Sequence, residues 1–193
     1  MPFKKVEEIL IEIALKIAVQ RKGCIFVIEF KPIKYNLLME QDIKTFNIFD
    51  NQRRIETLAM MDGAVIVSPS GDMKAYAAQI ADVKPFPGFG MRHASSYTAS
   101  IPGNTVILAS EEDAKVRIFK NGKLVMQLDA LERNIHTKTS DAVSILESIG
   151  IGTLGTIGTS LMIPTLGLSL IPGILIFGTS HYLVKQLGQQ SGR

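Results

Sequence analysis

The chain has 193 residues, a formal net charge of +3 and one cysteine. This length suits one globular domain with an appendage and argues against two compact domains. Acidic and basic residues are interleaved along the chain, so we find no basic tract of the kind that binds nucleic acid and expect no such partner. Cys24 has no second cysteine to pair with, and its apolar neighbours predict a buried strand thiol in a reducing compartment.

The first twenty residues carry an amphipathic pattern. Apolar residues recur at intervals of three and four over residues 6–18, with charged residues between them. This spacing predicts a helix within residues 1–20 that packs on the domain or on a partner. Because four charged side chains interrupt the apolar stretch, we do not expect it to be a secretory signal peptide.

Short β-rich runs separated by polar turns follow over residues 21–147. We also predict a short helix within 31–50, helical turns in 54–60 and 94–100, and a second amphipathic helix in 140–148. The Asn121-Gly122 pair is a strong hairpin signal. Together these elements predict an α/β domain with a mixed central β-sheet flanked by helices. The predicted strands are 24–30, 64–67, 74–80, 105–109, 116–119 and 123–127.

Three polar clusters lie at the ends of predicted strands, where α/β proteins commonly bind ligands. They are Asp62-Gly63-Ala64, Gly90-Met91-Arg92-His93 and Ser110-Glu111-Glu112. The set offers carboxylates, glycines that allow close approach to the backbone, and an arginine that can bind phosphate in a forked geometry. These groups suit a nucleotide with its metal. The alternative is that the clusters are an ordinary turn, a helix start and a solvated strand end.

The run from Arg21 to Leu128 resembles the diadenylate cyclase (DAC) domain family, whose signatures are a DGA motif and an RHR motif about thirty residues later. The resemblance rests on five segments in the family's order and spacing. These are Met61-Asp62-Gly63-Ala64-Val65-Ile66, Ala75-Tyr76-Ala77-Ala78, Gly90-Met91-Arg92-His93-Ala94-Ser95, Ile107-Leu108-Ala109-Ser110-Glu111-Glu112 and Asn121-Gly122-Lys123-Leu124.

The chain departs from the family pattern at two positions. The family usually has threonine where this chain has Met91, and a second arginine where it has Ala94. The first change removes a hydroxyl and the second removes a cation near the phosphates. Arg92 and His93 are retained, and Ser95 and Ser96 offer hydroxyl groups nearby.

The resemblance implies an enzyme that condenses two ATP molecules into the second messenger cyclic di-AMP, with two pyrophosphates released. Each domain would bind one ATP, and two facing domains of a homodimer or larger homo-oligomer would share the reaction. Catalysis of this kind depends on in-line positioning and charge neutralisation.

The resemblance also assigns roles to the residues of the three clusters. Asp62, Arg92 and His93 are the expected catalytic residues, and Asp62 would activate the attacking 3′-hydroxyl. A divalent cation, Mn²⁺ or Mg²⁺, would be held by Asp62, His93 and Glu112. The expected ATP-binding residues are Asp62, Gly63, Ala64, Gly90, Met91, Arg92, His93, Ser110, Glu111 and Glu112.

Residues 148–184 contain no Asp, Glu, Lys or Arg. An uncharged stretch of this length predicts a helical tail over 148–193 that is associated with the membrane, as one span or a re-entrant hairpin. The alternative is a buried oligomerisation hairpin in a soluble assembly. Because the expected substrate is ATP, we place the catalytic domain in the cytoplasm, attached to the cell membrane.

Two other functions remain open on the sequence. Met91 and Ala94 are compatible with a nucleotide-binding sensor that keeps the fold and has weak or no turnover. A structural membrane adaptor with a cyclase-like interaction domain is the third possibility, because fold alone does not fix function.

Overall fold

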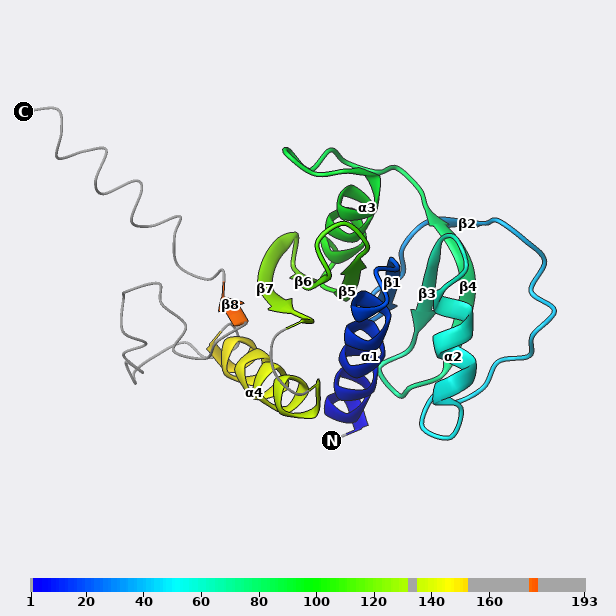
Figure 1. The fold of residues 1–193 in the computed structure, drawn as a ribbon. Helices are drawn as coiled ribbons and strands as arrows, with labels where there is room; N and C mark the ends of the chain where they lie inside the picture. The colour runs from blue at the N-terminus through cyan, green and yellow to red at the C-terminus, as the bar shows by residue number, and fades with distance from the viewer. Residues whose placement is uncertain (1, 132–134, 153–173, 177–193) are drawn as a thin grey trace, which may run out of the picture.

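The computed structural model describes residues 2–131, 135–152 and 174–176. Within these residues, an eight-stranded sheet has the strand order β2-β4-β3-β1-β5-β6-β7-β8 and is flanked by four helices (Figure 1). In chain order the elements are α1 (Pro2–Val19), β1 (Cys24–Ile28), β2 (Tyr35–Leu37), α2 (Gln52–Ala59), β3 (Ala64–Val67), β4 (Met73–Ile80), α3 (Met91–Ser100), β5 (Thr105–Ser110), β6 (Lys115–Lys120), β7 (Lys123–Asp129), α4 (Ile135–Gly152) and β8 (Ile174–Ile176).

The sheet is mixed, as the sequence predicted. Strands β1 and β3 are parallel, and β1 pairs with β5 in the antiparallel direction. Asn121 and Gly122 form the predicted hairpin turn between β6 and β7, and both have positive φ angles, 52° and 65°. Positive φ at both central residues is the geometry that an Asn-Gly turn favours.

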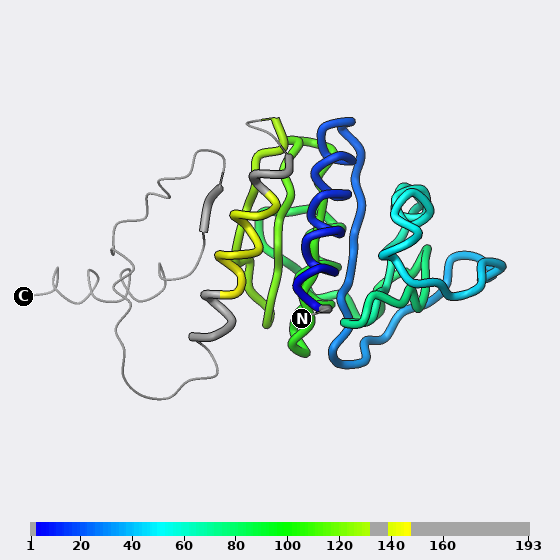
Figure 2. Tube along the Cα trace, turned by 90° about the horizontal axis from the view of Figure 1, so that it is seen from below, coloured from blue at the N-terminus to red at the C-terminus, as the bar shows by residue number. Residues whose placement is uncertain are grey.

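Helices cover both faces of the sheet. On one face α1, α2 and α4 form one apolar core with alternate side chains of the central strands, and α1 and α4 lie side by side (Figure 2). On the other face α3 covers a smaller core that includes Ile25, Leu108 and Phe119. Because successive strand residues point to opposite faces, each central strand is buried on both sides.

The N-terminal helix α1 belongs to the larger core and is buried on more than one side. Leu10 and Ile17 are fully buried, and so are Ile11 and Leu15. The helix contacts β5, β6, α2 and α4, which explains the burial beyond a single stripe. Cys24 is the predicted buried strand thiol, and desolvation raises its pKa to about 12.

Two local predictions were wrong. Residues 31–50 contain no helix; their regular element is the edge strand β2, which pairs with β4. Helix α3 begins at Met91 rather than Ala94, because the loop before it ends at Gly90, which acts as the N-cap without a side-chain cap bond. Arg92 and His93 therefore lie in the first turn of a helix.

The apolar tail is described in part. Helix α4 runs to Gly152, and residues 174–176 form the short strand β8 against β7, which differs from the predicted helical tail. The rest of residues 148–193 lies outside the described residues, as does most of the predicted membrane segment. Within the described part of the chain, no helix is long and apolar enough to cross a bilayer.

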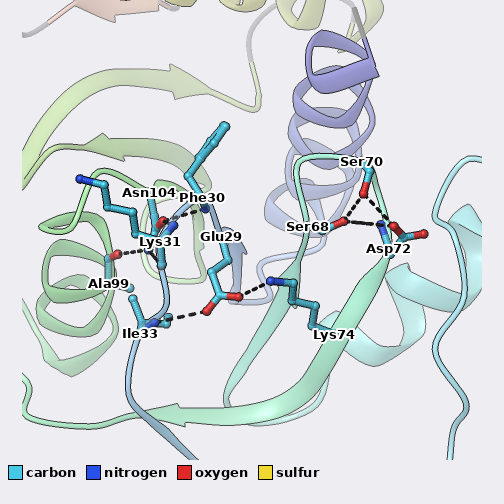
Figure 3. A network of polar contacts seen from close by, with 10 residues as sticks. All are labelled: Glu29, Phe30, Lys31, Ile33, Ser68, Ser70, Asp72, Lys74, Ala99 and Asn104. Atoms are coloured by element: carbon cyan, nitrogen blue, oxygen red, sulfur yellow. Dashed lines mark hydrogen bonds and ion pairs between the residues drawn. The ribbon is translucent and has the colours of Figure 1, made fainter.

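A polar network closes the end of the sheet where β1 and β3 finish and β5 begins (Figure 3). The Asn104 side chain accepts hydrogen bonds from the backbone N–H groups of Phe30 and Lys31, both at 2.8 Å. Its amide nitrogen donates to the carbonyl oxygens of Lys31 and Ala99 at 3.0 and 3.1 Å. This single buried side chain therefore links the segment after β1 to α3.

Candidate functional site

The three polar clusters gather at the opposite end of the sheet. In the strand register Ile25 of β1 lies beside Ala64 of β3, and Cys24 lies beside Ala109 of β5. The start of β1, the start of β3 and the end of β5 consequently lie side by side at one end of the sheet. Asp62, just before β3, and Ser110, at the end of β5, are separated by the width of one intervening strand.

Backbone geometry fixes the Asp62-Gly63 corner. Gly63 has a φ of +95°, and a Cβ at this position would lie 2.7 Å from the carbonyl carbon of Ala77. Ala77 has a positive φ of 47° at an irregularity in the β3–β4 pairing. Glycine is therefore required here for two reasons, its φ angle and the close approach of β4. The exposed Asp62 carboxylate accepts a hydrogen bond from the Gly63 N–H at 3.1 Å.

A small pocket brings two of the clusters together. Its volume is about 90 Å³, and it lies between the first turn of α3 and the end of β5. The lining residues are Gly90, Met91, Arg92, His93, Leu108, Ala109, Ser110, Glu111 and Glu112. Asp62, Gly63 and Ala64 are at the same end of the sheet but do not line this pocket, and Ala64 is buried within β3.

Arg92 spans the pocket and is paired. Its guanidinium lies 2.7 Å from a carboxylate oxygen of Glu111, and both side chains are about half exposed. Gly23 makes room for it, because a Cβ on Gly23 would lie 2.4 Å from an Arg92 guanidinium nitrogen. An anionic ligand would compete with Glu111 for this forked donor.

His93 is a neutral rather than a cationic group at neutral pH. Desolvation and the positive charge of Arg117 lower its pKa to about 4, against a smaller opposing effect of Asp113. Its Nε2 atom is buried without a hydrogen-bond partner among the described residues. The ring of Phe89 lies 4.7 Å from the imidazole ring, between centroids. Arg92, and not His93, therefore supplies the positive charge of this motif.

The turn after β5 carries three consecutive carboxylates with different surroundings. Glu111 is paired with Arg92, and Asp113 accepts hydrogen bonds from both terminal nitrogens of Arg117. Burial raises the pKa of Asp113, but hydrogen bonds from Arg117 and Ser110 and the charges of Arg117 and Lys115 outweigh it, and the pKa falls to about 2. The exposed Glu112 carboxylate forms no ion pair within the described ranges.

Sequence reasoning missed Gly23, Asp113 and Arg117. Gly23 lies just after the residues predicted as the first helix, and its proximity to Arg92 arises from pairing between β1 and β5. Arg117 was read as a strand residue, and alternation along β6 could have shown that it faces α3, like Phe119 in the smaller core. Met91 is 72% exposed at the pocket, and nothing lies within 4 Å of a Cβ built on Gly90.

The donor set fits a metal that arrives with a ligand better than a preformed metal site. Within the described residues, no three His, Cys, Asp or Glu side chains are grouped closely enough to hold an ion. Asp62, His93 and Glu112 thus do not form a preformed metal site within one chain. Mg²⁺ is commonly bound by one or two carboxylates together with phosphate oxygens, and the exposed carboxylates Asp62 and Glu112 suit that mode.

Comparison with known proteins identifies the fold and the family. A model of the DAC family, described as DisA bacterial checkpoint controller nucleotide-binding, matches residues 12–124. A diadenylate cyclase from Haloferax volcanii is 29% identical over 104 residues, which cover 51% of this chain and 38% of the relative. The chain thus matches well under half of that relative's length.

A crystal structure of a double mutant of DacA from Staphylococcus aureus has a similar fold, with a TM-score of 0.52 at 18% identity. The match covers 72% of this chain and 94% of the DacA chain. The family model spans more than half of the chain and includes the Asp62-Gly63, Arg92-His93 and Ser110–Glu112 clusters. The chain belongs to the DAC nucleotide-binding family.

Proposed function

We propose that this chain is a diadenylate cyclase, a nucleotidyltransferase that converts two ATP molecules into cyclic di-AMP and two pyrophosphates. The observation that carries the proposal is the meeting of the Arg92-His93 and Ser110–Glu112 clusters in one pocket. Asp62 and Gly63 lie at the same end of the sheet, and the chain belongs to the DAC family.

In this reaction a 3′-hydroxyl oxygen of one ATP attacks the α-phosphorus of the other, and the bond to the departing pyrophosphate breaks. A second attack of the same kind, with the roles of the two nucleotides exchanged, closes the ring and releases the second pyrophosphate. In this proposal the exposed Asp62 carboxylate accepts the hydroxyl proton. Arg92 binds phosphate oxygens once it leaves Glu111, and it offsets the charge of the leaving pyrophosphate.

The neutral His93 imidazole acts as a hydrogen-bonding group toward the nucleotide, and Ser110 contributes its hydroxyl. Gly63 and Ala64 shape the backbone beside Asp62, and Gly90 and Met91 form the opposite rim. The divalent cation, Mn²⁺ or Mg²⁺, would be held by Asp62 and Glu112 with the phosphates, and it neutralises charge when bound. Positioning and charge neutralisation together are the main demands of this chemistry.

The size of the pocket supports a site completed by a second subunit. Ligand pockets that enclose a small molecule usually measure about 300 Å³ or more, whereas this one measures about 90 Å³. One chain thus offers a surface for part of a nucleotide. A facing copy in a homodimer or larger homo-oligomer would supply the second ATP and enclose both.

We further propose that the catalytic domain works in the cytoplasm, where ATP is available, and that residues 148–184 attach it to the cell membrane. The support for attachment is the absence of Asp, Glu, Lys and Arg from this stretch.

The proposal is tested by incubating the purified full chain, in detergent if needed, with ATP and Mn²⁺ or Mg²⁺. Products are resolved by chromatography and mass spectrometry. We expect cyclic di-AMP from the wild type and from Asp50→Asn, a matched change of an exposed aspartate beside α2, and none from Asp62→Asn. Intact ATP across both metals and across concentrations that permit dimerisation would refute the cyclase.

The second candidate function is a nucleotide sensor, and it is favoured by Met91. Its exposed thioether side chain stands at the pocket where the family usually has a threonine hydroxyl. A sensor would bind ATP with the metal and yield little or no cyclic di-AMP. ATP titration of the same preparation therefore separates the two functions.

A further inference from the structure

Strand β6 carries a buried guanidinium beneath the turn that forms one wall of the pocket. The Arg117 side chain is 7% exposed, and its two terminal nitrogens donate to the two carboxylate oxygens of Asp113. Its Nε atom is buried without a hydrogen-bond partner among the described residues. A charge this deeply buried is costly unless its partner is held in a fixed geometry.

The same guanidinium lies beside Phe89, which directly precedes the residues of the other pocket wall. Its central carbon is 5.6 Å from the centre of the Phe89 ring, and the Phe89 ring lies against His93. The charge of Arg117 contributes to the lowered pKa of His93. Helix α3 contacts β6 directly. Arg117 consequently connects the two walls of the pocket from below.

Asp113 extends this connection to the pocket residues. It directly follows Glu112, and the Ser110 hydroxyl is one of the groups that lower its pKa. Lys115 adds a longer contact of 3.7 Å to the same carboxylate. The segment Ser110–Glu112 thus begins at the last residue of β5. It is followed at once by Asp113, whose carboxylate is held by the buried Arg117 guanidinium.

We propose that Arg117 is a positioning residue of the nucleotide site: through Asp113 it holds Ser110 and Glu112 opposite the first turn of α3. It also places a guanidinium beside the Phe89 ring, which lies against His93, in a chain whose position 94 is alanine. This inference rests on the proposed nucleotide-binding function. Arg117 does not line the pocket, so its effect on the nucleotide passes through the turn and through His93.

A purely structural role for the Arg117–Asp113 pair is the competing explanation. Melting temperature and ATP affinity together distinguish it from a positioning role. Buried ion pairs often add little to stability compared with apolar residues of similar size. Loss of a structural pair would lower the melting temperature and leave the ATP affinity of the folded molecules unchanged. Loss of a positioning pair raises the Kd and KM for ATP even where the fold is retained.

The test is a double-mutant cycle on the full chain, read by calorimetric titration with ATP and Mg²⁺ and by thermal unfolding. The variants are Arg117→Met, Asp113→Asn and the double variant, with Arg117→Lys, which keeps the charge and loses the fork. The control is Arg53→Met, which removes an exposed arginine on α2, away from the pocket.

We expect each single variant to raise the Kd for ATP about tenfold, and the double variant to be no weaker than the weaker single one, because the pair acts as a unit. Arg117→Lys should lie between wild type and Arg117→Met. Arg53→Met should stay within about twofold of wild type, since it touches no pocket residue. If Arg117→Met does not fold, Asp113→Asn and Arg117→Lys decide the question.

Folded variants that bind ATP with the wild-type Kd would overturn the inference and leave the cyclase proposal intact. A wild type that binds ATP without forming cyclic di-AMP would refute the cyclase, while the Kd values would still decide the role of Arg117. A wild type that does not bind ATP would refute both.

Discussion

The two ends of the sheet use polar residues in different ways. At the end where β5 begins, Asn104 makes four hydrogen bonds, and the Ser68 and Ser70 hydroxyls and Asp72 bond to one another (Figure 3). At the end where β5 finishes, His93 Nε2 and Arg117 Nε are buried without partners among the described residues, whereas Thr105 Oγ1 is such an atom where β5 begins. The exposed Glu112 carboxylate also forms no ion pair with the described residues there.

This difference teaches how function can be separated from folding in one small domain. Polar groups that serve the fold mostly bond to one another, with Thr105 Oγ1 as an exception, because an unpaired buried group costs about 1 to 3 kcal/mol. Polar groups that serve a ligand remain unpaired until the ligand binds, and they lower the stability of the free protein. The first end should therefore respond to mutation through stability, and the second through nucleotide binding.

The largest effect on stability is expected at the first end. Asn104→Ala removes four hydrogen bonds and leaves backbone groups of Phe30, Lys31 and Ala99 unpaired. We expect a loss of about 3 to 4 kcal/mol in the free energy of unfolding, measured by denaturant titration. The Kd for ATP of the folded fraction should not change. A higher Kd would contradict the claim that this end of the sheet affects stability and not nucleotide binding.

Gly63→Ala tests the backbone at the site end. The added Cβ would meet backbone atoms of Ala77 and Ala78 at 2.7 to 3.0 Å, at a φ of +95°. Because backbone cannot move aside as a flexible side chain can, we expect a loss of about 2 to 3 kcal/mol. Gly90→Ala is the control, since its Cβ would meet nothing within 4 Å. Equal unfolding free energies for the two variants would contradict the strained corner.

Glu7 sharpens the comparison, because it is a buried polar group that belongs to neither network and whose Oε1 has no partner among the described residues. Desolvation raises its pKa from 4.5 to about 7, with Lys120 opposing and Glu147 adding to the shift. The native state then binds more protons than the unfolded chain between these values, so stability falls as pH rises from about 4.5 to about 7.

Glu7→Gln should therefore be more stable than the wild type by about 2 kcal/mol at pH 8, with the gain vanishing near pH 4. Unfolding measured across this range is the test. Glu8→Gln, a change of the less buried neighbouring residue, should show no such gain. A pH-independent difference for Glu7→Gln would show that its carboxyl is not desolvated.

The smallest effect on stability is expected for Gly23→Ala. Its Cβ would meet the end of the flexible Arg92 side chain at 2.4 Å, and Arg92 can move aside. We expect a change in unfolding free energy below about 0.5 kcal/mol and a rise of about tenfold in the Kd for ATP, because a displaced guanidinium no longer meets the phosphates. An unchanged Kd would mean that ATP binding does not require the Arg92 guanidinium to lie beside Gly23.

The sequence predicted those parts of the fold that local pattern controls. The apolar runs 64–67 and 74–80 became β3 and β4 with little change in their ends, and Asn121-Gly122 formed its turn. The start of α3 was missed because Gly90 caps it without the Ser, Thr, Asp or Asn that normally marks an N-terminus. Strand β2 was missed because its pairing with β4 is non-local.

The site was predictable to the extent that its residues lie in short motifs. Arg92, His93, Ser110, Glu111 and Glu112 do meet in one pocket. Gly23 and Arg117 could not be found in this way, since their roles depend on which strands become neighbours and on which face of β6 meets α3.

The most direct test compares two matched ion pairs at the two ends of the sheet. Arg92 pairs with Glu111 at 2.7 Å, and Lys74 pairs with Glu29 at 2.6 Å. We would titrate ATP and Mg²⁺ into Arg92→Met and Lys74→Met. The account predicts at least about tenfold weaker binding for Arg92→Met, because it loses a charge-assisted contact to phosphate, and wild-type binding for Lys74→Met. Equal Kd values in the two variants would contradict the assignment of the nucleotide site to the end where Asp62, Arg92 and Ser110 meet.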